Sequence, residues 1–274
     1  MGESTPGILV AVVQFAPGDD RTHNRDVVSA FTAVAASRGA RLVVFPEYSS
    51  YFVHPLGEGF VRNAEALDGE FVRSLGESAR EHGVFVVAGL VERIEGERRF
   101  SNTLVAVSPS GSIVATYRKQ HLYDAFGARE SEWVVPGALD EPVVFEVDGM
   151  PVGMQTCYDI RFPEVTRRIV DAGAELVLVP AEWVRGPLKE SHWRTLVSAR
   201  AIENTVYVAA ADHAPPIGVG TSLIVDPMGV ALASLGENSA VAVAEVSRAR
   251  VAEVRTTNPS LALRRYRVEP ISES

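Results

Sequence analysis

The stretch ARLVVFPEYSSY at residues 40–51 has a counterpart in AELVLVPAEWVR at residues 174–185. Each stretch runs from an alanine through an apolar segment to a proline, and polar and aromatic residues follow the proline. A segment with helical spacing precedes each stretch, and a loop and a second such segment follow it. Strands that alternate with helices indicate the α/β class. The repetition predicts two similar α/β halves whose sheets pack face to face with the helices outside.

The rest of the chain continues this pattern. The spacing of apolar and small residues predicts helices over residues 24–37, 70–81, 163–172 and 188–204. Paired apolar segments predict hairpins over residues 100–119, 142–156 and 220–236. The strand segments are rich in Val and Leu and apolar throughout, as expected of strands covered on both faces. The residues after Ser247 are predicted to form a polar, Arg-rich tail.

Length and composition fit one domain over residues 1–274. The chain is 46% hydrophobic and 22% charged, which suffices for a large core, and no linker or low-complexity tract divides it. The first residues lack the basic segment of a signal peptide, and no segment reaches the ~18 apolar residues of a membrane helix. The net charge of −9 argues against a general nucleic-acid-binding protein. A single cysteine cannot form an internal disulfide, which fits a reducing cytoplasm.

Three predicted strands end beside residues that can do chemistry. Glu47 follows LVVFP, Lys119 follows IVATYR and Cys157 follows VGMQT. Sites in open α/β sheets form beyond the carboxyl ends of strands, so we expect these side chains to converge. A carboxylate can take a thiol proton, and a nearby ammonium lowers the pKa of the thiol. The ammonium and a backbone N–H, expected from Tyr158, can hold the oxyanion formed by attack on an amide. These groups suffice for amide hydrolysis without a metal or organic cofactor.

Each residue taken alone also has a plainer interpretation. A lone cysteine is most often a buried apolar residue, Glu47 could be a solvated carboxylate, and Lys119 could belong to a solvated basic run. Asp159 and Arg161 are expected to form an ion pair or to brace the cysteine turn. His121 either orients Lys119 or is an ordinary loop histidine. The histidines show no metal-ligand spacing, and the sequence contains no G-x-S-x-G elbow, phosphate loop or dinucleotide fingerprint.

Three segments of the chain resemble, in the same order, the signature segments of the carbon–nitrogen hydrolase (nitrilase) superfamily. They are VFPEYSSY at residues 44–51, YRKQHLYDAFGARES at residues 117–131 and GMQTCYDIRFPE at residues 153–164. The resemblance runs nearly from end to end of the chain. It implies a four-layer α-β-β-α sandwich, in agreement with the two predicted halves. It also implies a homodimer or a larger homo-oligomer, with the C-terminal tail from about residue 248 at an interface between subunits.

The same resemblance assigns roles to individual residues. It implies that Glu47 is the general base, Lys119 the cation that stabilises the oxyanion and Cys157 the nucleophile. Family members often have another glutamate between the lysine and the cysteine. Glu130 and Glu132 are the two candidates, and the position of ES ahead of PG favours Glu130.

The residues around the cysteine narrow the subtype. Tyr158-Asp159 resembles the amidase-like branches rather than the Trp-Glu of nitrilases, and the chain looks most like the Nit branch. The resemblance implies hydrolysis of a small ω-amide, of the ω-amidase or deaminated-glutathione-amidase type, to an acid and ammonia through a cysteine thioester. Trp183 is expected to wall the pocket or cap the core. Arg185 is expected to meet a substrate carboxylate or to be an exposed loop arginine. The alternatives are an N-carbamoyl amino acid or β-ureido acid amidohydrolase and a catalytically idle binding scaffold.

Overall fold

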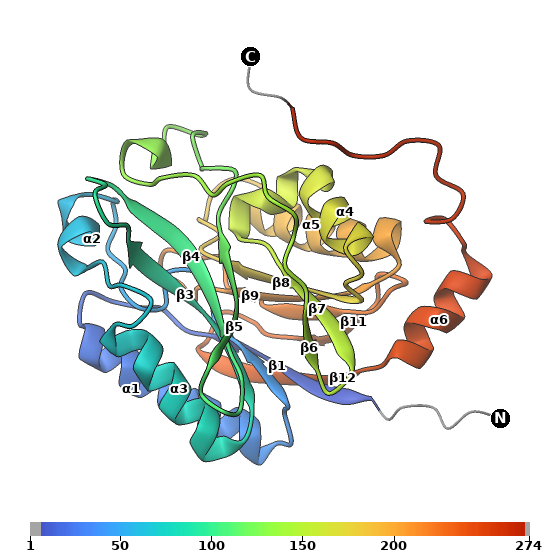
Figure 1. Ribbon diagram of the computed structural model, residues 1–274, viewed down its shortest axis with the longest axis horizontal. Helices are drawn as coiled ribbons and strands as arrows, with labels where there is room; N and C mark the ends of the chain where they lie inside the picture. Colours follow the sequence, from blue (N-terminus) through green and yellow to red (C-terminus); the bar gives the residue numbers. More distant parts are fainter. Residues whose placement is uncertain (1–6, 272–274) are drawn as a thin grey trace.

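The structure, a computed structural model, describes residues 7–271 and contains two six-stranded mixed sheets (Figure 1). The first sheet is ordered β12 (Ala240–Val246), β1 (Ile8–Gln14), β2 (Leu42–Val44), β3 (Phe85–Arg93), β4 (Phe100–Val107) and β5 (Ile113–Arg118). The second is ordered β11 (Ala231–Ser234), β10 (Leu223–Val225), β9 (Tyr207–Asp212), β8 (Leu176–Ala181), β7 (Met150–Met154) and β6 (Phe145–Val147).

The two sheets repeat one pattern of strand pairing. In the first sheet, β12 is antiparallel to β1, the strands β1, β2 and β3 are parallel, and β4 and β5 are antiparallel additions. In the second sheet, β6 is antiparallel to β7, the strands β7, β8 and β9 are parallel, and β10 and β11 are antiparallel additions. The repeated stretches lie on β2 and β8, which occupy equivalent places. The prediction of two similar halves is therefore confirmed.

The helices cover the outer faces of the two sheets and complete four layers. Helices α1 (Arg21–Ser37) and α3 (Glu70–His82) pack on the first sheet, and α4 (Pro163–Asp171) and α5 (Lys189–Asn204) pack on the second (Figure 1). Between the sheets lies a core to which both contribute, including Val44 on β2 and Leu178 on β8. Both faces of the central strands are thus covered, which explains why their sequences are apolar throughout.

Local capping decides where the predicted helices begin and end. Helix α1 begins at Arg21, three residues before its predicted start, because the Asp20 carboxylate accepts the N–H groups of Thr22 and His23 at 2.9 and 3.0 Å. Helix α3 ends at His82 because Gly83 adopts a left-handed conformation with φ of +64°. The other two predicted helices match α4 and α5 to within one residue at each end.

The prediction of a simple polar tail after Ser247 is wrong. Residues Arg248–Thr257 form helix α6, and the Ser247 side chain caps its start by accepting the Arg250 N–H at 3.3 Å. Arg248 pairs with Glu175 at 2.9 Å, and Arg250 pairs with Asp226 at 3.1 Å, so these arginines hold the helix against the second half. Residues 258–271 form no further helix or strand, and residues 272–274 lie outside the described range.

Three short helical segments occur in addition to the predicted helices. The short helix α2 (Glu58–Asn63) and two 3₁₀ helices, η1 (Glu130–Glu132) and η2 (Cys157–Arg161), were not predicted from the sequence. Within residues 7–271, no helix is both long and apolar enough to span a membrane.

Glycine at position 89 lets the segment that carries Glu47 lie directly on strand β3. The Gly89 N–H donates to the Pro46 carbonyl at 3.1 Å, and the Gly89 carbonyl accepts the Ser50 N–H at 3.0 Å. A Cβ at this position would lie 2.7 Å from Glu47 Cα and 2.6 Å from the Glu47 carbonyl carbon. Only a residue without a side chain leaves room for this backbone approach.

We therefore predict that Gly89→Ala destabilises the protein by about 2 kcal/mol or more, because the added methyl group must displace the backbone at Glu47. Gly18→Ala is the matched control, since a Cβ there meets nothing within 4 Å. Urea unfolding monitored by circular dichroism measures both variants. Equal unfolding midpoints for the two variants would contradict the prediction.

Candidate active site

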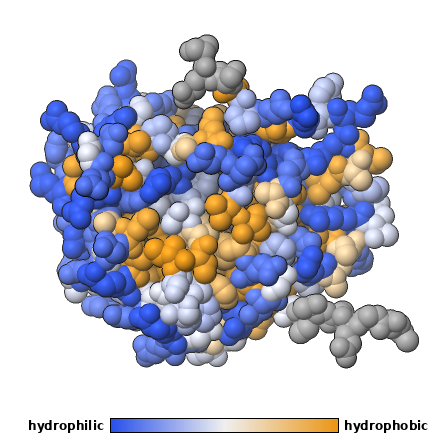
Figure 2. Space-filling model, viewed as in Figure 1, coloured by the Kyte–Doolittle hydropathy of each residue, from blue (hydrophilic) through white to orange (hydrophobic). Residues whose placement is uncertain are grey.

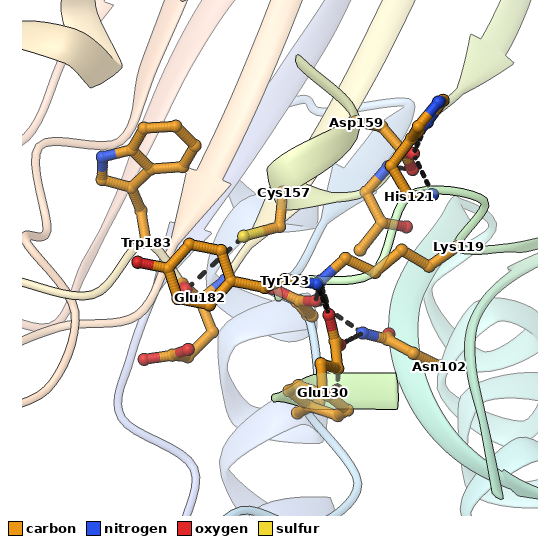
Figure 3. Close-up of polar contacts among 12 residues, drawn as sticks. Asn102, Lys119, His121, Tyr123, Glu130, Cys157, Asp159, Glu182 and Trp183 are labelled. Atoms are coloured by element: carbon orange, nitrogen blue, oxygen red, sulfur yellow. Dashed lines mark hydrogen bonds and ion pairs between the residues drawn. The ribbon is translucent and has the colours of Figure 1, made fainter. Parts of the chain in front are cut away.

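The candidate site is a cavity of about 800 Å³ at the carboxyl ends of the parallel strands of both sheets. Glu47 follows β2, Lys119 follows β5, Cys157 follows β7, and the 3₁₀ helix η1 supplies Glu130. All four residues line this cavity (Figure 3 shows Lys119, Glu130 and Cys157). The structure thus brings together the four residues that the sequence singled out, from segments as far apart as positions 47 and 157.

The Lys119 ammonium lies between two carboxylates. Its Nζ is 2.9 Å from Glu47 Oε1 and 2.9 Å from Glu130 Oε2, and the three side chains are at most 4% exposed. Burial alone would lower the pKa of Lys119, but the charges of Glu130 and Glu47 outweigh it and raise the pKa well above its usual range. The lysine is therefore a permanent cation in this cavity.

Neutral donors complete the coordination of the two carboxylates. Asn102 on β4 donates its side-chain N–H groups to Glu47 Oε1 at 2.6 Å and to Glu130 Oε1 at 3.2 Å. The Tyr48 hydroxyl donates to Glu130 Oε1 at 2.7 Å, and the Glu182 backbone N–H donates to Glu47 Oε2 at 2.6 Å. Each buried carboxylate thus receives several hydrogen bonds, which is what an ionised acid needs away from water.

Cys157 opens the 3₁₀ helix η2 with a strained backbone. Its φ is +45°, a left-handed conformation that costs a non-glycine residue about 1–3 kcal/mol. The thiol is 3.5 Å from the carbonyl oxygen of Glu182, to which it donates, and the residue is 6% exposed. The strained turn holds the sulfur at the cavity wall beside the Glu47–Lys119 pair.

The thiol is neutral in the resting site. Burial raises the pKa of Cys157 well above its usual range, and the negative charge of Glu47 raises it further, against a lowering by Lys119. The sequence predicted that the lysine would lower the thiol pKa. Lys119 does lower it, but burial and Glu47 raise it by more, so the net shift is upward. Activation of this sulfur requires an acceptor for its proton, and Glu47 is the adjacent carboxylate.

Asp159 braces the cysteine turn, but it does not pair with Arg161 as one of the expectations had it. The buried Asp159 carboxylate accepts the Tyr117 hydroxyl at 2.7 Å, the His121 N–H at 2.9 Å and the Thr156 N–H at 3.2 Å. His121 Nδ1 lies 2.9 Å from the same carboxylate, so this ring serves Asp159 and does not orient Lys119 (Figure 3).

Two cations lie over aromatic rings that line the cavity. Lys189 Nζ is 4.3 Å from the ring centroid of Phe126 and donates to the Tyr123 hydroxyl at 2.8 Å. It forms no salt bridge with a carboxylate among residues 7–271. The Arg161 guanidinium lies 4.7 Å from the Trp183 ring centroid, and its Nε is buried without a hydrogen-bond partner in the described structure. Burial and the charge of Arg161 both lower the pKa of Lys189, so an anion between them would be favourable.

The remaining sequence candidates lie at different depths. Trp183 is 3% exposed and lines the cavity, with its indole N–H donating to the Lys189 carbonyl at 2.9 Å. Arg185 also lines the cavity, but it pairs with Glu237 at 2.7 Å and is largely solvated. The Glu132 side chain is 57% exposed and 3.7 Å from Arg129, so Glu130 and not Glu132 contacts the lysine. Tyr158 follows Cys157 in the first turn of η2, where backbone N–H groups lack partners within the helix.

Three residues of the site were not predicted from the sequence: Glu182, Asn102 and Lys189. A signal existed for two of them. Glu182 lies in the PAEW segment, at a strand end equivalent to that of Glu47, and Asn102 lies in a short polar run, Ser101–Thr103, within strand β4. Lys189 gave no such signal, because its role depends on how its side chain lies over the aromatic rings. Within the described residues, no group of three or more His, Cys, Asp or Glu side chains could hold a metal ion.

Comparison with known proteins shows the family of this chain. A family model described as carbon-nitrogen hydrolase matches residues 9–256. The chain is 41% identical over 260 residues to the deaminated glutathione amidase of Escherichia coli O157:H7, a match that covers 94% of this chain and 98% of that protein.

Solved structures share the fold. The C. elegans NitFhit protein superimposes with a TM-score of 0.88 at 28% identity, over 96% of this chain and 66% of that one. An amidase variant from Nesterenkonia sp. AN1, with the acetamide moiety of fluoroacetamide covalently added at its active site cysteine, gives a TM-score of 0.79 at 27% identity, over 96% of this chain and 100% of that one.

The ion-pair geometry predicts that substitutions of Glu130 and Glu132 change the free energy of unfolding by different amounts. Glu130→Gln removes a buried charge from Lys119 and should lower the free energy of unfolding by about 2 kcal/mol. Glu132→Gln removes only a solvated charge and should change it by less than about 0.5 kcal/mol. Chemical denaturation of both variants checks this, and a Glu132→Gln variant as unstable as Glu130→Gln would contradict it.

Proposed function

The chain belongs to the carbon–nitrogen hydrolase family and is an amide-hydrolysing enzyme, and we propose that Cys157 is its nucleophile. One observation carries the proposal. A thiol, a carboxylate and an ammonium from distant segments meet in a single cavity, where the carboxylate of Glu47 contacts both the Lys119 ammonium at 2.9 Å and the segment that accepts the Cys157 hydrogen bond.

In the proposed acylation step, Glu47 takes the thiol proton as the sulfur attacks the carboxamide carbon. The carbonyl oxygen becomes an oxyanion, which the Lys119 ammonium and the Tyr158 backbone N–H stabilise. Glu47 then passes its proton to the amide nitrogen, the C–N bond breaks, and ammonia leaves. The substrate acyl group remains on Cys157 as a thioester. The raised pKa of the thiol fits this order of events, since the proton leaves only during attack.

Deacylation uses the same groups. Glu47 takes a proton from a water molecule, the resulting hydroxide attacks the thioester carbon, and the oxyanion again forms beside Lys119. The C–S bond then breaks, and the sulfur recovers its proton from Glu47 as the free acid departs. Glu130 acts in this scheme as a positioning residue, because it fixes the Lys119 ammonium and shares Asn102 with Glu47.

For the substrate, we propose a small linear amide that carries a carboxylate at the end remote from the scissile bond. Lys189 and Arg161 are two cations beside the cavity with no carboxylate partner in the described chain. A substrate carboxylate would supply the missing negative charge. Trp183 would form the wall beneath this carboxylate, and Arg185 would contact substrate at the rim. The relative named deaminated glutathione amidase supports a small carboxamide as the substrate.

We also propose that the enzyme acts in the cytoplasm as a homo-oligomer, without a nucleic-acid or membrane partner. Hydrophobic residues gather across the middle of the face shown in Figure 2, and strand β5, which crosses this part of the view in Figure 1, exposes Ile113 and Val114. Residues 258–271 add the exposed apolar side chains of Leu263, Tyr266 and Ile271. Exposed apolar surface of this kind supports contact with another subunit.

The mechanism predicts that Cys157→Ala lowers the rate of ammonia release by at least about 10³-fold, because no other group can form the thioester. Thermal unfolding should show that the variant remains folded. Glu47→Gln should likewise block both steps. Ammonia release at the wild-type rate from Cys157→Ala would rule out the mechanism, and a normal burst of acyl-enzyme in Glu47→Gln, seen by intact mass spectrometry, would rule out the assigned base.

The substrate proposal predicts a change that depends on substrate charge. With succinamic acid, Lys189→Met should raise KM by about tenfold or more because the carboxylate loses a cation. With the methyl ester of succinamic acid, which lacks that charge, KM should change by less than about threefold. Arg194→Met, an exposed cation on the same helix α5, is the matched control. Equal KM changes for the acid and the ester would refute a carboxylate contact at Lys189.

A further inference from the structure

Glu182 has a side chain that the mechanism does not use. It follows strand β8, lines the cavity and is 9% exposed. Its backbone is engaged on both sides, since its N–H donates to Glu47 and its carbonyl accepts from Cys157. Its carboxyl group is not engaged: Oε1 is buried without a hydrogen-bond partner, and no salt bridge reaches the side chain from any described residue. In Figure 3 this carboxyl group points away from the Lys119 cluster, and no dashed line reaches it.

The three buried glutamates of the cavity differ in what surrounds them. Glu47 and Glu130 each receive hydrogen bonds from Lys119 and from neutral donors, as an ionised carboxylate requires. Glu182 receives none in the described structure. A buried carboxylate without donors is costly, and the Lys119 ammonium already neutralises part of the charge of the other two acids. A neutral carboxylic acid at position 182 avoids that cost.

The electrostatic surroundings agree with this assignment. Burial raises the pKa of Glu182 well above its usual range, and the charges of Glu47 and Asp212 raise it further, against a lowering by Lys119. A carboxyl group that stays protonated at neutral pH carries an O–H donor. No hydrogen bond from residues 7–271 reaches the Glu182 carboxyl group, so a ligand in the cavity can supply an acceptor for this O–H.

We propose that Glu182 is a specificity-determining residue, which as a neutral acid donates a hydrogen bond to an uncharged oxygen of the substrate. This inference rests on the proposed function and deepens it. The Glu182 backbone contacts Cys157, and the next residue, Trp183, lies under Arg161. The substrate oxygen therefore belongs to the part of the molecule between the scissile amide and the remote carboxylate. A keto group there is a pure acceptor, and its absence leaves the Glu182 O–H unpaired.

The ionisable groups that face Glu182 all influence its titration. These groups come from the segments after β2 and β5, from η1, η2 and α5, and from the end of β9. They are Glu47, Tyr48, Lys119, Tyr123, Glu130, Cys157, Arg161, Lys189, Asp212 and His213. A substitution at position 182 leaves all of them in place, so a difference between variants reports on Glu182 itself or on its effect on these neighbours.

The test compares three four-carbon amides that differ at one carbon: succinamic acid, its 2-oxo analogue and asparagine, which carries an ammonium there. The wild type should prefer the 2-oxo compound over succinamic acid by about tenfold in kcat/KM. Glu182→Gln, a neutral residue that still donates, should keep this preference to within about threefold. Glu182→Leu should reduce it to about one. The preference of the wild type should fall at alkaline pH as Glu182 ionises, and in Glu182→Gln it should not.

Several outcomes would overturn the inference. If asparagine is the best of the three substrates and Glu182→Gln loses it, the residue is an ionised acceptor. The wild type, Glu182→Gln and Glu182→Leu could all show the same ratio of kcat/KM for the 2-oxo compound to kcat/KM for succinamic acid. In that case Glu182 does not contact this part of the substrate, and the proposed function still stands. If the wild type releases ammonia from none of the three, the proposed function fails and the inference fails with it. Glu164→Gln, an exposed acid on α4, controls for a general charge effect, and melting curves control for folding.

Discussion

The cavity depends on one buried ammonium that two carboxylates hold. Removing Lys119, Glu47 and Glu130 from water carries a large desolvation cost for each charge, and only close, hydrogen-bonded contact between them offsets it. The geometry meets this condition, because Lys119 Nζ lies 2.9 Å from each acid and Asn102 bridges the two. The cluster carries a net negative charge beside a buried thiol. Burial of the thiol, together with this charge, keeps the proton on the sulfur in the resting site, and Glu47 is the adjacent acceptor for that proton.

The duplicated architecture is what brings these groups together. The first half supplies Glu47, and the second supplies Cys157 and Glu182, so the cavity forms only where the halves meet. Contacts made by His213 join the two halves next to Glu47. His213 follows β9 and lies 2.6 Å through Nε2 from the Glu47 carbonyl, to which it donates, and a bridge pairs it with Phe15 at the end of β1. Burial lowers the pKa of His213 to about 4, so the ring remains a neutral donor at physiological pH.

The sequence predicted the parts of this structure that follow from periodicity and from strand ends. The repeat on β2 and β8 predicted the two halves, and the residues after three strands predicted Glu47, Lys119 and Cys157 as the site. Three-dimensional details were beyond it. The φ of +45° at Cys157, the net rise in its pKa and the pairing of Asp159 with His121 rather than with Arg161 all depend on how distant segments pack. Helix α6 was not predicted because its arginines are typical of a solvated tail. In the structure they pair with acidic residues of the second half.

Glu47 and Glu182 occupy similar positions in the two halves, but their local environments favour different charge states. Both follow equivalent strands, and both lie at the wall of one cavity, yet their surroundings require opposite charge states. Donors surround Glu47, which can therefore accept a proton from a thiol or a water molecule. Glu182 lies in the same electric field with no donor from the described chain, and the cheaper state for it is the neutral acid. A single site can in this way hold a base for the reaction and an acid for recognition, although both side chains are glutamates and both come from the same duplicated element.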